Sequence, residues 1–105
     1  TGDLGSLGKE LADELMKNQG LNIAKIYTDC GVLIYDLKKQ DVHAGGSGCG
    51  CSASVFCGYF YKLLKSGKLK RMLLVSTGAL LSTTSSQQGE SIPSIAHAVT
   101  IEGRA

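Results

Sequence analysis

The amino-acid sequence predicts one small domain of the α/β class, with helices packed on a sheet. Two segments carry apolar residues at helical spacing, and two segments in the last third of the chain are typical of strands. A glycine-rich stretch precedes each of the two helical segments. The length of 105 residues corresponds to one domain or to a piece of a larger one.

The first predicted helix covers Ser6 to Asn18. Leu7, Leu11 and Leu15 recur every four residues and form an apolar stripe. The other side of this helix carries the charged residues Lys9, Glu10, Asp13, Glu14 and Lys17. Gly20 is a typical helix end. The next segment, LNIAKIYTDCGVLIYD, predicts short extended pieces around a break at Cys30-Gly31.

A second helix is predicted to begin at Ser52. Its apolar residues occur as neighbouring pairs four residues apart, which are Val55, Phe56, Tyr59, Phe60, Leu63 and Leu64. The pair Ser66-Gly67 ends this helix.

Two strands are predicted after the second helix. The apolar run from Arg71 to Thr77 is typical of a strand that is buried on both faces. Residues 78–94 form a long polar loop that contains Pro93. The alternation over Ala96 to Glu102 then predicts a final strand.

Charge and hydropathy argue against several classes of protein. A net charge of +2 is too small to argue for nucleic acid or an anionic membrane as a partner. The four basic residues from Lys65 to Arg71 straddle a turn, and we interpret them as a solvated edge. No apolar run approaches the roughly 18 residues that a membrane-crossing helix needs. The sequence has no signal-peptide pattern either.

We expect the chain to be a fragment of a longer protein or a processed product. The chain opens with Thr1-Gly2-Asp3 rather than methionine, as a fragment or a processed product does. The tail Ile101-Glu102-Gly103-Arg104 matches a protease linker that is often engineered into expressed proteins, although a native end is the alternative.

The stretch GGSGCGCSASVF (residues 45–56) could be a metal site, a phosphate cradle, a redox pair or a tight turn. Cys30, Cys49, Cys51 and Cys57 are expected to be reduced, because the chain has strong apolar periodicity and no export signal. Structural zinc sites use two matched cysteine pairs, whereas Cys49-x-Cys51 has no matching pair. Small buried thiols that fill tight packing are the favoured interpretation.

Two further interpretations of this loop are weak. Gly48-x-Gly50-x-x-Ala53 matches the relaxed dinucleotide fingerprint, but no good strand precedes it and no acidic residue follows at the required distance. A catalytic thiol needs a neighbouring base. His97 lies in a predicted strand, where a core histidine is the favoured interpretation, and Asp29-Cys30 and Asp41-x-His43 define no geometry.

Five motifs occur in an order that resembles one known family. They are TGDLG, YTDCGVLIYD, QDVHAGGSGCGCSA, LLVSTGALLS and QQGESIPSIAHAVTIE. Together they resemble the C-terminal third of the stage V sporulation protein AD family of spore-forming bacteria. That family is similar to the thiolase superfamily, near the ketoacyl synthases. The resemblance implies thiolase-like α/β/α layers with a mixed sheet, with residues 1–105 as the C-terminal part of the second half.

The resemblance also implies which chemistry is missing. Thiolase-like condensing enzymes use a histidine and an asparagine from their second half. Asp3 stands about where that histidine would be, and Ser47 about where the asparagine would be. We therefore expect no catalytic residue and no enzyme activity. The alternative is a thiolase-like or ketoacyl-synthase-like acyltransferase fragment that uses His97 or a thiol.

The function implied by the resemblance is binding of dipicolinic acid and support of its uptake into the developing spore, with a link to germination. The expected ligand-binding residues are Asp3, Ser47, Gly48, Cys49, Gly50, Ser52 and His97. No metal or cofactor is expected, although calcium could accompany the ligand. Expected partners are further copies of the chain and other proteins of the same sporulation system, but not nucleic acid. The expected location is peripheral, on the cytoplasmic side of the forespore inner membrane.

The glycine loop offers a chemical rationale for such a ligand, which is a flat ring with two carboxylates. Backbone N–H groups at the start of the second helix, with the hydroxyls of Ser47 and Ser52, could receive an anion. Glycines at 46, 48 and 50 would let the ligand approach the main chain. Asp3 would repel an anion unless calcium or a proton bridges them. The alternative is that this loop only packs.

Overall fold

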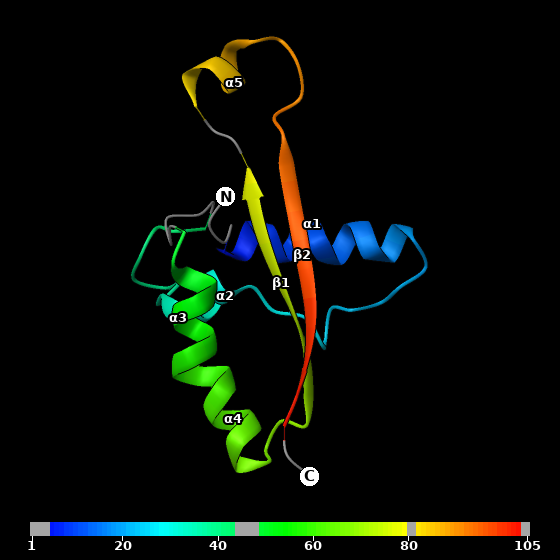
Figure 1. The fold of residues 1–105 in the computed structure, drawn as a ribbon, viewed down its shortest axis with the longest axis vertical. Coiled ribbons are helices and arrows are strands. Elements are labelled where there is room, and N and C mark those ends of the chain that lie inside the picture. Colours follow the sequence, from blue (N-terminus) through cyan, green and yellow to red (C-terminus); the bar gives the residue numbers. More distant parts are fainter. Residues whose placement is uncertain (1–4, 44–48, 80–81, 104–105) are drawn as a thin grey trace. The chain divides into compact units, whose positions relative to one another are not determined.

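The computed structural model describes residues 5–43, 49–79 and 82–103. They belong to two compact units, and the boundary between the units lies between Val55 and Phe56 in the sequence. The first contains α1 (Gly5–Asn18), α2 (Cys30–Ile34) and α3 (Cys51–Val55). The second contains η1 (Phe56–Phe60), α4 (Tyr61–Ser66), β1 (Arg71–Ala79), α5 (Thr83–Gln87) and β2 (Ser94–Glu102) (Figure 1).

Helix α1 confirms the first predicted helix and begins one residue earlier, at Gly5. At its end, the N–H of Leu21 donates to the carbonyl oxygen of Met16 at 2.8 Å, and Gly20 adopts φ +84°. Positive φ at this position is a common way for a helix to end. The apolar stripe is only partly covered, because Leu11 is 44% exposed and Leu15 is 62% exposed.

Helix α2 contradicts the prediction of extended pieces around Cys30-Gly31. The chain is helical from Cys30 to Ile34, and Asp29 is its N-cap residue. The Asp29 carboxylate accepts a hydrogen bond from the N–H of Gly31, which is one of the backbone donors that a helix start leaves unpaired. A short apolar run is ambiguous between strand and helix, and here the cap decides for helix.

The second predicted helix is confirmed from Cys51 to Ser66, although it consists of three segments. The middle segment, η1, is a π-helix, a wider turn that helical spacing alone does not predict. Gly67 ends α4 with φ +78°, and its N–H donates to the carbonyl oxygen of Leu64 at 3.3 Å. Cys51, Val55 and Leu64 are the buried apolar residues among those described, at 3%, 7% and 4% exposure.

Strands β1 and β2 form a two-stranded antiparallel sheet in the second unit, with Arg71 opposite Glu102 and Ala79 opposite Ser94. The two strands were predicted, but both are longer than expected. Within residues 78–94, which we predicted to be a loop, Gly78 and Ala79 extend β1, Thr83–Gln87 form α5, and Ser94 begins β2.

Burial of β1 on both faces was predicted and is wrong for the described chain. Residues opposite each other in an antiparallel pair project to the same face. Leu73 and Val75 project to one face and are 61% and 45% exposed. Val99 lies on the other face and is 57% exposed. Both faces of the hairpin are therefore apolar in composition and open to solvent in the described chain.

The helices and the sheet are compatible with the predicted α/β class. The predicted mixed sheet with thiolase-like α/β/α layers stays a prediction, since the described strands form one antiparallel pair. Among the helices of the described residues, none combines the length and the apolar character that crossing a bilayer requires.

Candidate functional site

Three of the ligand-binding residues predicted in the glycine loop belong to the part of the chain that the structure describes. Cys49 and Gly50 are exposed where the loop meets α3, and Ser52 is half-buried in the first turn of that helix. The carbonyl oxygen of Gly50 accepts a hydrogen bond from the N–H of Ser54 at 3.0 Å, so Gly50 directly precedes the helix. The other loop candidates, Ser47 and Gly48, lie outside the described residues, as does Asp3.

The interpretation of this loop as a close-packed turn is wrong at Gly50. A Cβ atom added there would meet nothing within 4 Å. Packing therefore does not require glycine at position 50. The space beside its main chain is open, which is the condition that a ligand approaching the backbone would need.

The four cysteines are reduced, and their environments differ. Cys51 is 3% exposed in the first turn of α3, as expected for a thiol that fills packing space. Cys49 and Cys57 are exposed, so the packing interpretation is wrong for these two residues. Cys30 is half-buried at the start of α2.

His97 lies in β2 opposite Ser76 and is exposed. The interpretation of His97 as a core histidine is therefore wrong. His97 belongs to the second unit, whereas Cys49, Gly50 and Ser52 belong to the first. The predicted ligand-binding residues thus fall into two separate units of the chain.

The first unit contains a junction, built on Asp29, that the sequence patterns did not predict. Asp29 Oδ1 accepts hydrogen bonds from the N–H of Gly31 at 2.8 Å and from the N–H of Gly5 at 3.1 Å. The same carboxylate therefore caps α2 and ties it to the start of α1. The signal in the sequence was Asp29 directly before a short apolar run, which is a typical N-cap position.

Close backbone contacts explain the glycines of this junction. Gly5 has φ +65°, and a Cβ there would lie 2.9 Å from the carbonyl oxygen of Val42. A Cβ at Gly31 would lie 3.2 Å from the Cα atom of Gly5. The first distance is shorter than real Cβ contacts, and the second is tighter than most of them. The two glycines therefore let the helix starts and the segment before the loop approach one another.

His43 joins the segment before the glycine loop to the first turn of α1. The N–H of Leu7 donates to the carbonyl oxygen of His43 at 3.0 Å. The Ser6 hydroxyl and His43 Nδ1 lie 3.0 Å apart in a hydrogen bond. The sequence pattern Asp41-x-His43 hinted at Asp41 as a partner of His43. Its observed partner, Ser6, is 37 residues away in the sequence, and no local pattern indicates it.

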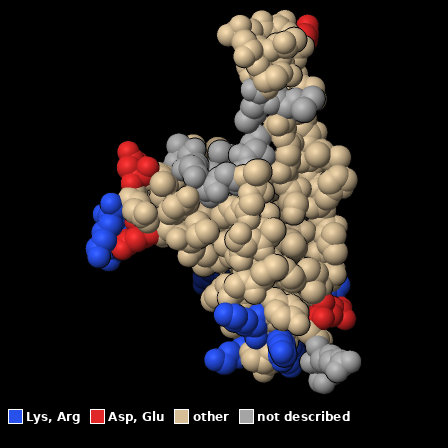
Figure 2. Space-filling view, turned by 60° about the vertical axis from the view of Figure 1, so that its left-hand side comes forward, with Lys and Arg blue, Asp and Glu red and all other residues tan. Residues whose placement is uncertain are grey.

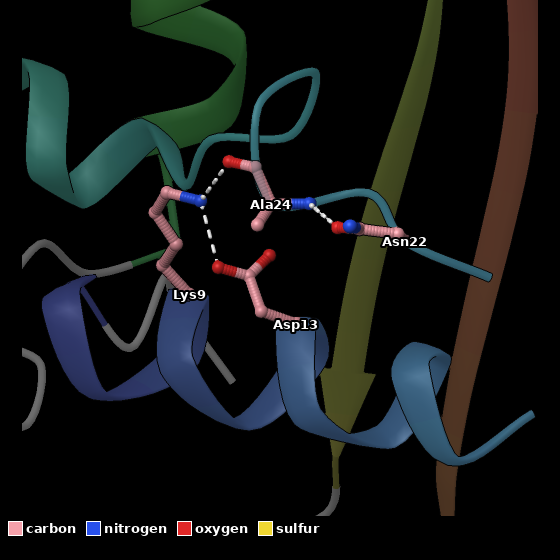
Figure 3. Close-up of polar contacts among 4 residues, drawn as sticks. All are labelled: Lys9, Asp13, Asn22 and Ala24. Atoms are coloured by element: carbon pink, nitrogen blue, oxygen red, sulfur yellow. Dashed lines mark hydrogen bonds and ion pairs between the residues drawn. The ribbon is translucent and has the colours of Figure 1, made fainter. Parts of the chain in front are cut away.

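A second polar cluster connects α1 to the segment that follows it (Figure 3). Lys9 Nζ lies 2.8 Å from Asp13 Oδ2 and 3.0 Å from the carbonyl oxygen of Ala24. The same ammonium group lies 5.3 Å from the centre of the Tyr27 ring. The N–H of Ala24 donates to Asn22 Oδ1 at 3.4 Å. The lysine therefore holds the returning chain against the helix.

This cluster borders an open pocket of about 630 Å³, lined by Glu10, Asp13, Glu14, Lys17, Asn22 and Ala24. Three of these side chains are carboxylates and one is a lysine, so the pocket is unsuited to a dianion. Asp13 Oδ1 has no hydrogen-bond partner among the described residues. Among all the residues that the structure describes, no group of three or more His, Cys, Asp and Glu side chains is arranged to hold a metal ion.

Comparisons with known proteins agree with the motifs in the sequence. Residues 1–102 match the family model described as Stage V sporulation protein AD (SpoVAD). The chain is 48% identical over 102 residues to the protein named Stage V sporulation protein AD of Bacillus subtilis (strain 168). That match covers 97% of this chain and 30% of the relative, so the chain spans less than a third of the length of that protein.

Proposed function

Because the chain belongs to the stage V sporulation protein AD family, we propose that it is a non-enzymatic part of a sporulation protein that binds dipicolinic acid. The protein would support uptake of this ligand into the developing spore and have a part in germination. The family match over residues 1–102 carries the proposal. A role in sporulation follows from that match, whereas the ligand is part of the proposal.

The proposed absence of catalysis rests first on Asp3 and Ser47, which stand at the positions where thiolase-like enzymes carry histidine and asparagine. Covalent acyl transfer needs an accessible thiol beside a base. Cys51 is 3% exposed, and the ring of His43 bonds to the Ser6 hydroxyl, so these two residues do not form such a pair.

The ligand would contact the end of the glycine loop that leads into α3. Dipicolinate carries two carboxylates, and exposed main chain beside Gly50 offers N–H groups without a side chain in the way. The half-buried Ser52 hydroxyl is a second donor. The acid-lined pocket beside α1 is not proposed as the site, because its carboxylates would repel the ligand.

The setting of the protein is also part of the proposal. It would lie peripherally on the cytoplasmic side of the forespore inner membrane, next to other proteins of the same sporulation system and further copies of itself. The exposed apolar faces of the hairpin support association with other protein surfaces.

Calorimetric titration of the purified chain with dipicolinate tests the ligand. We expect saturable binding, and weaker binding of isophthalate, which has the same two carboxylates but no ring nitrogen. Titrations with and without calcium would show whether the ion takes part. If dipicolinate and isophthalate bind with equal affinity, or if neither binds, dipicolinate is rejected as the specific ligand of this part of the protein.

A further inference from the structure

Basic residues are concentrated in one short segment of the second unit. Five of the eleven Lys and Arg residues lie within residues 62–71, and this segment contains no Asp or Glu. We name this group the basic turn, and it consists of Lys62, Lys65, Lys68, Lys70 and Arg71. All five residues are exposed. The net charge of +2 for the whole chain conceals this local concentration.

The basic turn lies where α4 ends and β1 begins. Lys62 and Lys65 belong to α4, Lys68 and Lys70 to the connection, and Arg71 is the first residue of β1. Figure 2 shows Lys and Arg side chains gathered at the lower end of the view, where Figure 1 places this connection.

Backbone hydrogen bonds make the connection an ordered platform for these charges. The N–H of Leu69 donates to the carbonyl oxygen of Leu63 at 3.1 Å. The N–H of Gly103 donates to the carbonyl oxygen of Lys70 at 2.8 Å. Leu64 anchors the helix end with 4% exposure. The positive charges therefore project from a fixed part of the unit.

Neighbouring acidic groups neutralise little of this charge. Arg71 Nε lies 3.5 Å from Glu102 Oε1, and both side chains are about two-thirds exposed, at 69% and 66%. Water and salt screen such an exposed pair. The four lysines form no ion pair with any described residue. A favourable interaction with the C-terminal end of α4 explains Lys65, but it does not explain Lys68 and Lys70, which follow the helix.

We propose that the basic turn docks the chain on an anionic lipid bilayer. Four of its five members are lysines, which act as point charges and lack the planar fork with which arginine recognises single phosphates or base edges. A diffuse anionic surface suits such a set better than one specific phosphate. This inference deepens the proposed peripheral location and rests on it.

An exposed aromatic residue accompanies the basic turn. Tyr61 is 52% exposed and precedes Lys65 by four residues in α4, so the two side chains share one side of the helix. Tyrosine is enriched at the level of lipid headgroups, where its ring meets apolar chains and its hydroxyl meets water. Lysine and tyrosine on one side of α4 therefore favour a membrane surface over an acidic protein.

Vesicle flotation of the whole chain tests the proposal. The lipid probes are vesicles of phosphatidylcholine alone and of phosphatidylcholine mixed with phosphatidylglycerol. We expect binding only to the anionic vesicles, with a strong decrease as salt is raised. Each basic residue near an anionic bilayer contributes about fivefold in binding, so K62Q/K65Q/K68Q should bind about a hundredfold more weakly.

A matched control separates the basic turn from net charge. K25Q/K38Q/K39Q removes three exposed lysines of the first unit and gives the same net charge. This control should stay within about threefold of the original chain. Circular dichroism of both variants verifies that they are folded. Equal losses in the two variants, or equal binding to neutral vesicles, would overturn the proposal.

Two additional measurements assign any failure to its source. Tighter binding to duplex DNA than to anionic vesicles at the same salt would identify nucleic acid as the partner and reject the membrane. Dipicolinate titration of K62Q/K65Q/K68Q should match the original chain, because the proposed ligand-contacting residues, Gly50 and Ser52, are unchanged in this variant. A chain that binds dipicolinate but not vesicles rejects only this inference, and the reverse result rejects only the proposed ligand.

Discussion

Asp29 Oδ1 accepts a hydrogen bond from the N–H of Gly5 at 3.1 Å, across 24 residues of sequence. The same oxygen accepts from the N–H of Gly31 at 2.8 Å. One carboxylate therefore serves the starts of two helices. Because it joins these two helix starts, we expect Asp29 to matter for the stability of the first unit.

Asp29→Ala should lower the free energy of unfolding by about 1–3 kcal/mol, since it removes a cap and leaves two part-buried N–H groups without this acceptor. Urea unfolding followed by circular dichroism measures the change. Asp41→Ala is the matched control, because Asp41 is exposed, and its effect should be below about 0.5 kcal/mol. Equal effects of the two substitutions would show that the junction does not stabilise the unit.

Gly103→Ala should destabilise the second unit by about 1–3 kcal/mol. A Cβ at this position would lie 2.7 Å from the carbonyl oxygen of Leu64 and 3.2 Å from that of Leu69, and backbone atoms cannot move aside cheaply. Gly58→Ala is the control, because a Cβ there meets nothing within 4 Å. Alanine is the better helix former, so the control should be neutral or slightly stabilising. A neutral result for Gly103→Ala in thermal unfolding would contradict the close contact.

The four thiols should react with Ellman's reagent at different rates. Cys49 and Cys57 are exposed and should react first, and the half-buried Cys30 should follow. Cys51 is 3% exposed and should react only as fast as the unit opens. Cys51→Ala, which leaves the two fast reactions unchanged, identifies the slow thiol, and urea should make all four fast. Reaction of Cys51 at the rate of Cys49 would mean that the start of α3 is open to solvent.

Gly50→Val and Ser52→Ala test whether the loop end contacts dipicolinate. Valine at 50 enters open space, so it should leave the unit folded while it blocks approach to the main chain. We expect each substitution to weaken dipicolinate binding about tenfold, the usual effect of losing one hydrogen bond to a charged group. Ser54→Ala, on an exposed residue of the same helix, is the control. Affinities within twofold for both test variants would place the ligand elsewhere.

Local pattern was sufficient for the longest elements. The stripe of Leu7, Leu11 and Leu15 predicted α1 to within one residue, because a helix of 14 residues is long enough to show its period. The alternation before Glu102 predicted β2, although the strand begins at Ser94. The same reasoning failed at α2, where the five residues from Cys30 to Ile34 are too few to show a period.

What the sequence determined by itself is helix α1, the helix that ends at Ser66, the two strands, the family, and the concentration of charge in residues 62–71. Only the tertiary structure decided that Asp29 reaches Gly5, that Ser6 bonds to His43, and that Gly103 must fit against Leu64. Periodicity and capping act over a few residues, so they can be read along the chain. Contacts between residues that are 24 or 37 positions apart depend on how the backbone folds to bring the two segments together. No pattern within either segment encodes such a contact.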